Sequence, residues 1–314
     1  MMNIVILDAK TLGDDLDLSV LDQFGKVVRY ETTDPSETYE RIRNATIVIT
    51  NKVVISRLHM QRCPLLKLIC IAATGTNNVD LEAAAQIGIE VKNVAGYSTN
   101  SVVQHTFAMA LYLLEKMAYY DHSVKNKEWS RSGLFTDVSH PFFEIAGKNW
   151  GIIGLGEIGM GVAKVAEAFG ANVSYYSTSG KNSDAHYTQQ SLEELLNTCE
   201  IISIHAPLNA QTKNLIHADN LRLLRENSIL LNLGRGGIVN ESDLAKALDD
   251  RTIYAGLDVV EKEPIPTDNP LLHIEAQERL LITPHIAWAS KEARVKLLEG
   301  IVGNITSFLK QEGI

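Results

Sequence analysis

A glycine-rich stretch between a short apolar run and a helical run constrains the fold of this chain more than any other feature. The apolar residues Trp150–Ile153 predict a buried strand, and Val162–Phe169 predict a helix. Between them stand Gly154, Gly156 and Gly159. In such a turn the first glycine permits the sharp bend, the second leaves the backbone open to a pyrophosphate, and the third lets helix and strand lie close together. The stretch therefore predicts a strand–turn–helix unit that binds a dinucleotide.

The first residues of that helix are the expected contacts of the pyrophosphate. The first N–H groups of a helix lack partners within it and carry a partial positive charge, and here they belong to Glu157 and Ile158. A glycine-rich turn without a ligand is the alternative interpretation, because this motif alone is weak evidence. The strand, the glycines and the helix follow in the required order, which favours dinucleotide binding.

Length and charge limit the classes of protein that this chain can be. Its 314 residues suit two domains, at about 150 residues each. With 45% hydrophobic and 21% charged residues, it can bury proper cores. The net charge of -9 argues against nucleic acid or an anionic membrane as the main partner, so we expect neither.

Cysteine usage and the N-terminus give the expected metal content and location. Cys63, Cys70 and Cys199 are too few and too scattered for a disulfide framework or a zinc site, so we expect buried thiols and no metal. The N-terminus lacks the basic segment and apolar core of a signal peptide. No apolar run reaches the roughly 18 residues of a membrane helix. The predicted location is cytoplasmic.

Strands and helices alternate along most of the chain, which predicts parallel sheets with helices on their faces. The apolar segment Asn100–Tyr120 is expected to be one long helix that leaves the first β/α set and leads to the glycine turn. We therefore expect a nucleotide-binding domain at 99–284 and a second domain made of 1–98 and 285–314. The expected strands are 3–8, 27–30, 46–50, 66–71, 89–91, 150–153, 173–176, 201–205, 229–233, 253–257 and 280–282, and the other expected helices are 37–43, 81–87, 162–169, 192–197, 218–224, 241–248 and 291–309.

The segment Lys125–Gly147 interrupts this alternation. It is polar, yet it contains Trp129, Phe135, Phe142 and Phe143, too much apolar surface for a free linker. An arm that packs on a partner subunit explains it, and a homodimer through the nucleotide-binding domain follows from that interpretation. A loop folded on its own domain is the alternative.

Three polar residues that follow predicted strands could supply the groups that hydride transfer needs. Reducing a carbonyl leaves an alkoxide that must receive a proton, and a 2-oxo acid needs a cation for its carboxylate. His285 is the candidate proton donor, and Glu263 could hold its imidazole and raise the pKa of the pair toward neutrality. Arg235 stands between glycines and offers a fixed fork of donors. Locally, a surface histidine, a solvated loop acid and a surface arginine remain open alternatives.

The order of the motifs resembles that of the D-isomer-specific 2-hydroxyacid dehydrogenases over nearly the whole chain. Several motifs in one order are far more specific than any single one. They are Ala73–Asp80, the glycine turn, His205–Leu208, Asn232–Gly236, Leu257–Val259, Glu263–Pro264 and Thr283–His285. This resemblance and the alternation give the predicted fold class: α/β, with two doubly wound parallel-sheet domains, a Rossmann dinucleotide-binding domain inserted in a flavodoxin-like substrate domain.

The resemblance also implies roles for individual residues. Arg235 would bind and polarise the 2-oxo acid, and His285 would donate the proton with Glu263 as its partner. Asp258 would lie beside the nicotinamide carboxamide. Three neighbouring residues would belong to the cofactor-binding scaffold: His205, Ala206 and Pro207.

The expected substrate contacts lie in the N-terminal domain. By resemblance, the backbone N–H groups of Thr74 and Gly75 would hold the substrate carboxylate. Tyr97 falls where D-lactate-type members carry a substrate-side tyrosine, and Asn51 and Lys52 fall in a strand-end loop that lines the same pocket. Exposed loop residues without a role are the alternative for these last three.

The choice between NAD and NADP depends on the strand that follows the glycine turn and its helix. An acid about 20 residues past the glycines would bond the ribose hydroxyls and select NAD. Ser177 stands at that place, and Thr178, Ser179 and Lys181 follow, so hydroxyls and a lysine could accept the extra phosphate of NADP. We expect NADP(H) or dual use rather than NAD(H) alone, with a polar turn of no cofactor role as the alternative.

The implied activity is reversible reduction of a small 2-oxo acid by NAD(P)H to the D-2-hydroxy acid. Thr50–Lys52 and Pro141–Ile145 favour hydroxypyruvate and glyoxylate reductases, whereas Tyr97 favours D-lactate-type members. A phosphoglycerate-type enzyme would need more basic N-terminal loops. A non-catalytic, NAD(H)-sensing corepressor of the same fold is the rival class, and the intact acid–base set weighs against it.

Overall fold

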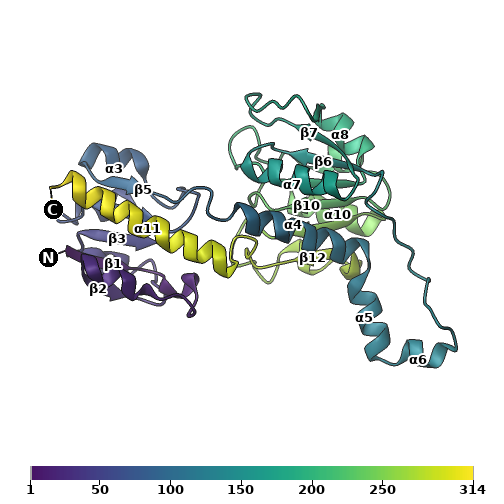
Figure 1. The fold of residues 1–314 in the computed structure, drawn as a ribbon, viewed down its shortest axis with the longest axis horizontal. Coiled ribbons are helices and arrows are strands. Elements are labelled where there is room, and N and C mark those ends of the chain that lie inside the picture. Colours follow the sequence, from purple (N-terminus) through teal and green to yellow (C-terminus); the bar gives the residue numbers. More distant parts are fainter. Residues whose placement is uncertain (1, 314) are drawn as a thin grey trace. The chain divides into compact units, whose positions relative to one another are not determined.

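The structure, a computed structural model, describes residues 2–313 and divides the chain into two compact units (Figure 1). The first unit consists of residues 1–98 and 289–314, and the second of residues 99–288. The chain thus returns from the second unit to the first after residue 288, rather than after residue 284 as expected. The cause is Asp258, buried in the second unit, which accepts the backbone N–H groups of His285, Ile286 and Ala287.

The first unit is built on a five-stranded sheet in the order β2-β1-β3-β4-β5, with every pairing parallel. This is the flavodoxin-like order. Its central strands β3 and β4 are apolar and fully buried, as parallel strands covered on both faces must be. The strands are β1 (Met2–Ile6), β2 (Gly25–Arg29), β3 (Ile47–Thr50), β4 (Leu68–Ile71) and β5 (Glu90–Lys92), and the helices are η1 (Ala9–Leu12), η2 (Leu18–Phe24), α1 (Thr38–Ile42), α2 (Arg57–Gln61), α3 (Leu81–Ile87) and α11 (Lys291–Gln311).

Helix α11 completes the core of the first unit, although the whole second unit separates it from β5 in sequence. Ser290 caps it by accepting the N–H of Ala293 at 3.2 Å. Leu297, Ile301 and Ile305 recur every four residues and are fully buried, so one face of the helix is apolar. The first unit therefore needs residues that precede the second unit in the sequence and residues that follow it.

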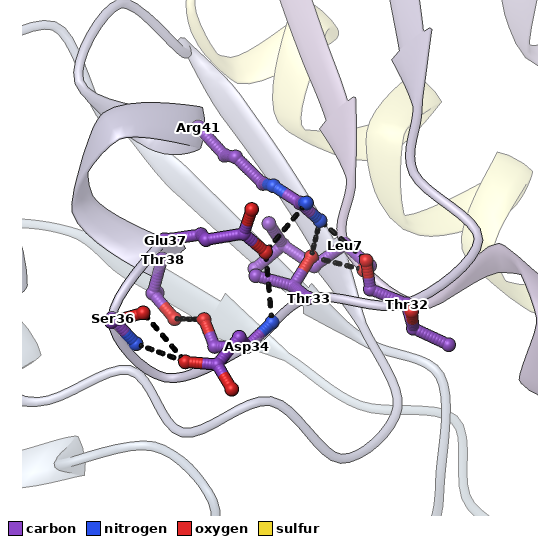
Figure 2. A network of polar contacts seen from close by, with 8 residues as sticks. All are labelled: Leu7, Thr32, Thr33, Asp34, Ser36, Glu37, Thr38 and Arg41. Carbon is purple, nitrogen blue, oxygen red and sulfur yellow. Dashed lines mark hydrogen bonds and ion pairs between the residues drawn. The ribbon is translucent and has the colours of Figure 1, made fainter.

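Arg41 of α1 ties the loop after β2 to the end of β1 (Figure 2). Its guanidinium donates to Thr33 Oγ1 at 2.6 Å, to the Thr32 carbonyl oxygen and to Glu37 Oε2 at 2.7 Å. The Thr33 hydroxyl donates in turn to the carbonyl oxygen of Leu7. Hydrogen bonds to a charged group are stronger than neutral ones, so this network fixes a loop at the carboxyl edge of the sheet.

The second unit is built on a seven-stranded parallel sheet in the order β12-β11-β10-β9-β6-β7-β8. Six of these strands follow the doubly wound Rossmann order, with the switch point between β6 and β9. Trp150 of β6 is fully buried, and its indole N–H donates to Ser203 Oγ at 3.0 Å. The strands are β6 (Asn149–Ile153), β7 (Asn172–Tyr176), β8 (Thr188–Gln189), β9 (Ile201–Ile204), β10 (Ile229–Asn232), β11 (Tyr254–Leu257) and β12 (Leu280–Ile282). The two sheets confirm the predicted fold class.

The expected single helix at 100–120 is wrong in its extent. The structure has two helices there, because Lys116 adopts a left-handed backbone with φ +54° and breaks the chain of helical hydrogen bonds. The Lys116 ammonium lies 3.3 Å from the centre of the Tyr254 ring, a cation–π contact that holds it there. The helices of this unit are α4 (Thr99–Leu114), α5 (Met117–Lys125), α6 (Glu128–Ser132), α7 (Glu157–Ala168), α8 (Leu192–Thr198), α9 (Ala218–Leu221), α10 (Glu241–Asp250), η3 (Pro270–Leu272) and η4 (Gln277–Arg279).

Residues 117–148 form an arm that projects from the seven-stranded sheet, with α5, α6 and a long returning loop (Figure 1). The arm exposes large apolar side chains: Phe135 is 91% exposed, Val138 77%, Leu134 68% and Phe142 52%. Monomeric proteins rarely leave so much apolar surface together in water. The interpretation as a loop folded on its own domain is therefore wrong for these side chains.

Candidate active site

The glycine turn between β6 and α7 has the close packing and the open face that a pyrophosphate requires. Gly154 has φ +94°, and a Cβ there would lie 3.1 Å from the Ala206 backbone. A Cβ at Gly159 would lie 2.2 Å from the Gly154 carbonyl oxygen, so α7 can lie this close to β6 only with glycine. A Cβ at Gly156 would meet no atom within 4 Å. Two glycines thus shape the turn and the third leaves space beside it, which fits a bound dinucleotide.

Helix α7 directs its first N–H groups toward the space beside Gly156, its N-cap residue. The Glu157 side chain accepts a hydrogen bond from Thr99 Oγ1 at 2.8 Å, so this carboxylate is engaged with α4. Ile158 packs against the core. The backbone of these two residues, rather than their side chains, is what the turn offers to phosphates.

Ser177, the first residue after β7, has a hydroxyl that is buried and has no hydrogen-bond partner among residues 2–313. Buried polar atoms are nearly always paired, so an unpaired one at a strand end marks a place for a ligand atom or water. Ser179 and Lys181 follow in an exposed turn and are linked by a bond from the Lys181 N–H to Ser179 Oγ at 3.2 Å, with Thr178 partly buried before them.

The loop after β9 packs against both the glycine turn and the loop after β10. A Cβ at Gly234 would lie 2.7 Å from the Ala206 carbonyl oxygen, and Pro207 is exposed beside it. Both ring nitrogens of His205 are buried without a partner in the described chain, and burial lowers the pKa of His205 to about 3. The ring is therefore neutral at physiological pH, which suits the scaffold role.

Asn232 at the end of β10 shapes the loop that carries Arg235. Its side chain accepts the Gly234 N–H at 3.1 Å and donates to the Arg235 carbonyl oxygen at 2.9 Å. A Cβ at Gly236 would lie 2.0 Å from the carbonyl oxygen of Val260, so the backbones of the two loops touch. The Arg235 guanidinium is partly exposed and donates to the Gly234 carbonyl oxygen at 2.8 Å, which leaves further N–H groups for a ligand.

His285 and Glu263, 22 residues apart in sequence, are joined by a hydrogen bond of 2.7 Å between Nδ1 and Oε2. The other carboxylate oxygen of Glu263 accepts the N–H of Val260 at 3.3 Å. The carboxylate accepts the proton on Nδ1, which leaves Nε2 of His285 to face a ligand. The His285 side chain is 21% exposed, so a substrate in solution can reach it.

Asp258, the first residue after β11, contacts the loop that carries His285. It is 2% exposed, and its carboxylate accepts Thr283 Oγ1 at 2.6 Å, the Ile286 N–H at 2.8 Å and the Ala287 N–H at 2.9 Å. Its place beside the nicotinamide stays a prediction. What the structure shows is that this carboxylate holds the loop of His285.

In the first unit, the Asn51–Lys52 loop after β3 is held by a buried carboxylate, Asp8. Asp8 accepts the N–H of Asn51 at 2.9 Å and of Lys52 at 2.7 Å, and the Asn51 amide donates to Thr11 Oγ1 at 3.1 Å. Asn51 and Tyr97 are buried, at 5% and 9% exposure, so the alternative of exposed loop residues is wrong for both, whereas Lys52 is exposed.

Thr74 and Gly75 follow β4 in a loop at the same edge. Thr74 is exposed, and its carbonyl oxygen accepts the side-chain amide of Asn93 at 2.6 Å. The roles of Asp8 and Asn93 were not recognised in the sequence. The position of Asp8 was a usable signal, because it stands two residues after the end of β1, much as Asp258 stands after β11.

A Rossmann sheet with this glycine turn, an arginine loop and a paired histidine and glutamate at its carboxyl edge defines a nicotinamide-dependent oxidoreductase. Residues 107–287 match the family described as D-isomer specific 2-hydroxyacid dehydrogenase, NAD binding domain. The chain belongs to this family.

Its similarity to individual members extends over nearly the full length of both chains. It is 36% identical to a hydroxypyruvate reductase of Blautia hydrogenotrophica, over 98% of this chain and 97% of that protein. It is 39% identical to a glycerate dehydrogenase of Methylorubrum extorquens, over 89% and 88%. Among solved structures it resembles an NADPH-dependent glyoxylate/hydroxypyruvate reductase of Sinorhizobium meliloti, in complex with NADP and malonate, with a TM-score of 0.82, 26% identity and 98% and 93% coverage.

No group of three or more His, Cys, Asp or Glu side chains in residues 2–313 is placed to hold a metal ion. No helix in that range is both long enough and apolar enough to cross a bilayer.

Proposed function

We propose that this protein reduces a small 2-oxo acid, with hydroxypyruvate and glyoxylate favoured, to the D-2-hydroxy acid by use of NAD(P)H, in a reversible reaction. The observation that carries the proposal is the 2.7 Å pair of His285 and Glu263 on the same sheet edge as Arg235. The relatives named hydroxypyruvate reductase and glycerate dehydrogenase support this choice of substrate.

In this proposal each residue of the set has one task. Arg235 binds the carboxylate and the carbonyl oxygen of the 2-oxo acid, since its fork of donors matches two oxygens at once. Glu263 fixes the imidazole of His285 through Nδ1, and Nε2 delivers a proton to the oxygen that becomes the hydroxyl. The bound nicotinamide supplies the hydride. The backbone at Thr74 and Gly75, with Asn51, Lys52 and Tyr97, is proposed to line the substrate side.

The test is a panel of initial rates with NADH and NADPH against hydroxypyruvate, glyoxylate, pyruvate and 3-phosphohydroxypyruvate. We expect the first two acids to give the highest kcat/KM. A preference for pyruvate would assign the protein to the D-lactate type, and one for the phosphorylated acid to the phosphoglycerate type. If the protein binds nucleotide but reduces none of these acids, the proposed activity is wrong and the corepressor-like binding protein replaces it.

The nicotinamide cofactor is proposed to be NADP(H), or both nucleotides, because the buried and unpaired hydroxyl of Ser177 stands where NAD-selective enzymes place a carboxylate. The variant Ser177→Asp should favour NADH. Its carboxylate would accept the ribose hydroxyls and repel the extra phosphate, so kcat/KM with NADPH should fall by roughly tenfold or more while the value with NADH does not fall. Ser183→Asp, in the exposed part of the same loop, is the control. An unchanged ratio of the two nucleotides in Ser177→Asp would contradict this role.

We also propose a homodimer whose interface includes the arm. A groove of about 770 Å³ runs along α4 and α5, lined by Leu111, Tyr112 and Met117 among others, and gives the exposed side chains of a second arm an apolar surface to cover. Phe135→Asp should shift the protein from twice the 34.6 kDa chain mass toward the monomer in analytical ultracentrifugation, because a charge would be buried without a partner. Leu272→Asp, at an exposed site outside the arm, should not. A monomeric wild type would refute the dimer.

Cytoplasmic location and the lack of nucleic-acid or membrane partners stay predictions.

A further inference from the structure

The loop that carries His285 has a backbone conformation that its own sequence does not favour. His285 has φ +54°, in the left-handed region that residues other than glycine avoid because Cβ crowds the backbone. Such a conformation persists only where surrounding contacts determine it. The contacts that hold this loop therefore set where the imidazole lies.

Asp258 supplies most of these contacts. Its backbone carbonyl oxygen accepts the N–H of His285 at 2.9 Å, and its carboxylate accepts the N–H groups of Ile286 and Ala287. The hydroxyl of Thr283 donates to the same carboxylate at 2.6 Å. The residues on both sides of His285 are thus bound to a single buried side chain.

Helix α4 supplies the other contacts through two residues one turn apart on the same face, Ser101 and His105. Ser101 Oγ donates to the carbonyl oxygen of Ala287 at 2.6 Å, and His105 Nε2 lies 3.1 Å from Thr283 Oγ1. Thr283 has one hydroxyl proton, which it donates to Asp258. His105 Nε2 must therefore be the donor toward Thr283, and a chain of bonds runs from α4 to the carboxylate.

We propose that Ser101 and His105 are positioning residues for the proton donor. His105 orients Thr283, which orients the carboxylate of Asp258, and Ser101 holds the far end of the loop at Ala287. Through these bonds to Thr283 and Ala287, both side chains act on His285 by way of its loop. This inference rests on the proposed function, in which His285 delivers the proton.

Kinetics of α4 variants test the proposal. In His105→Leu the Thr283 hydroxyl loses its donor, and kcat should fall roughly tenfold or more, because small misplacements of a catalytic group are costly. The Kd for the nucleotide should change by less than about twofold. His105→Gln should recover most of kcat, since its amide nitrogen can donate in place of Nε2. Ser101→Ala should lower kcat in the same direction. Gln104→Leu, an exposed site on the same helix, is the matched control.

A second readout does not depend on turnover. In protein labelled with ¹⁵N-histidine, the imidazole signals of His285 should move in His105→Leu and Ser101→Ala, stay in place in Gln104→Leu, and return toward the wild-type position in His105→Gln. Unchanged kcat and unchanged His285 signals in His105→Leu would overturn the proposal, as would an equal loss in Gln104→Leu. If the wild type reduces no 2-oxo acid, the proposed function fails, and the His285 signals alone decide whether α4 positions the loop.

Discussion

His285→Ala is expected to abolish nearly all turnover while leaving nucleotide binding intact. The imidazole is the group that delivers the proton in the proposed reaction, and general acid catalysis contributes about 10²–10⁴ in rate. The imidazole is bonded to Glu263, and the backbone N–H of residue 285, which the variant keeps, is bonded to Asp258 and Thr283, so the glycine turn between β6 and α7 is not changed. Steady-state kcat and the fluorescence of bound NADH or NADPH measure the two effects separately.

The control for this variant is His273→Ala, which removes an exposed histidine of the same unit whose Nε2 lies 3.0 Å from the Thr267 carbonyl oxygen. It should keep the turnover of the wild type. Turnover near the wild-type value in His285→Ala would remove the proton-donor role, whatever the substrate proves to be.

Arg235→Lys is expected to damage the use of the 2-oxo acid even though the charge is kept. Lysine offers a point charge in place of the planar fork, so at least one charge-assisted hydrogen bond to the substrate is lost. A bond of that kind is worth about 1.5–3 kcal/mol, which corresponds to a fall in kcat/KM of roughly tenfold to a hundredfold. The nucleotide Kd should not change, since Arg235 is outside the glycine turn.

Arg222→Lys is the matched control, because Arg222 is an exposed arginine of the same unit paired with Asp219. It should leave kcat/KM unchanged. A KM for hydroxypyruvate and a kcat both equal to the wild type in Arg235→Lys would show that the guanidinium does not bind the acid.

The regular part of the fold could be predicted because its signals are local. The strands β9 and β10 are short apolar runs that are buried along their whole length, and both were expected. The break between α4 and α5 could not be predicted, because it depends on the left-handed backbone of Lys116 and its contact with Tyr254. That contact joins residues far apart in sequence, and nothing in the apolar pattern of the helix records it.

The candidate site, like the fold, has a part that could be predicted from the sequence and a part that could not. The glycines of the turn and the residues after β10, β11 and β12 could be named from the sequence, since each belongs to a short motif at a strand end. The hydrogen bonds that Asp8 and His105 make could not be predicted, because they reach loops far away in the sequence. The bond from the Asn51 N–H to Asp8, for example, spans 43 residues. Which residues react is a local property, whereas what holds them in place is a property of the fold.

The division of the first unit into two segments has a consequence for the order of events on the ribosome. Residues 99–288 are continuous, so this unit can fold as soon as they have emerged, as domains generally do during synthesis. The five-stranded sheet is made first yet must wait for α11, whose buried Leu297, Ile301 and Ile305 complete its core. Until then its apolar surface is open to water and to chaperones. The nascent chain thus holds a finished second unit before it has a finished first unit.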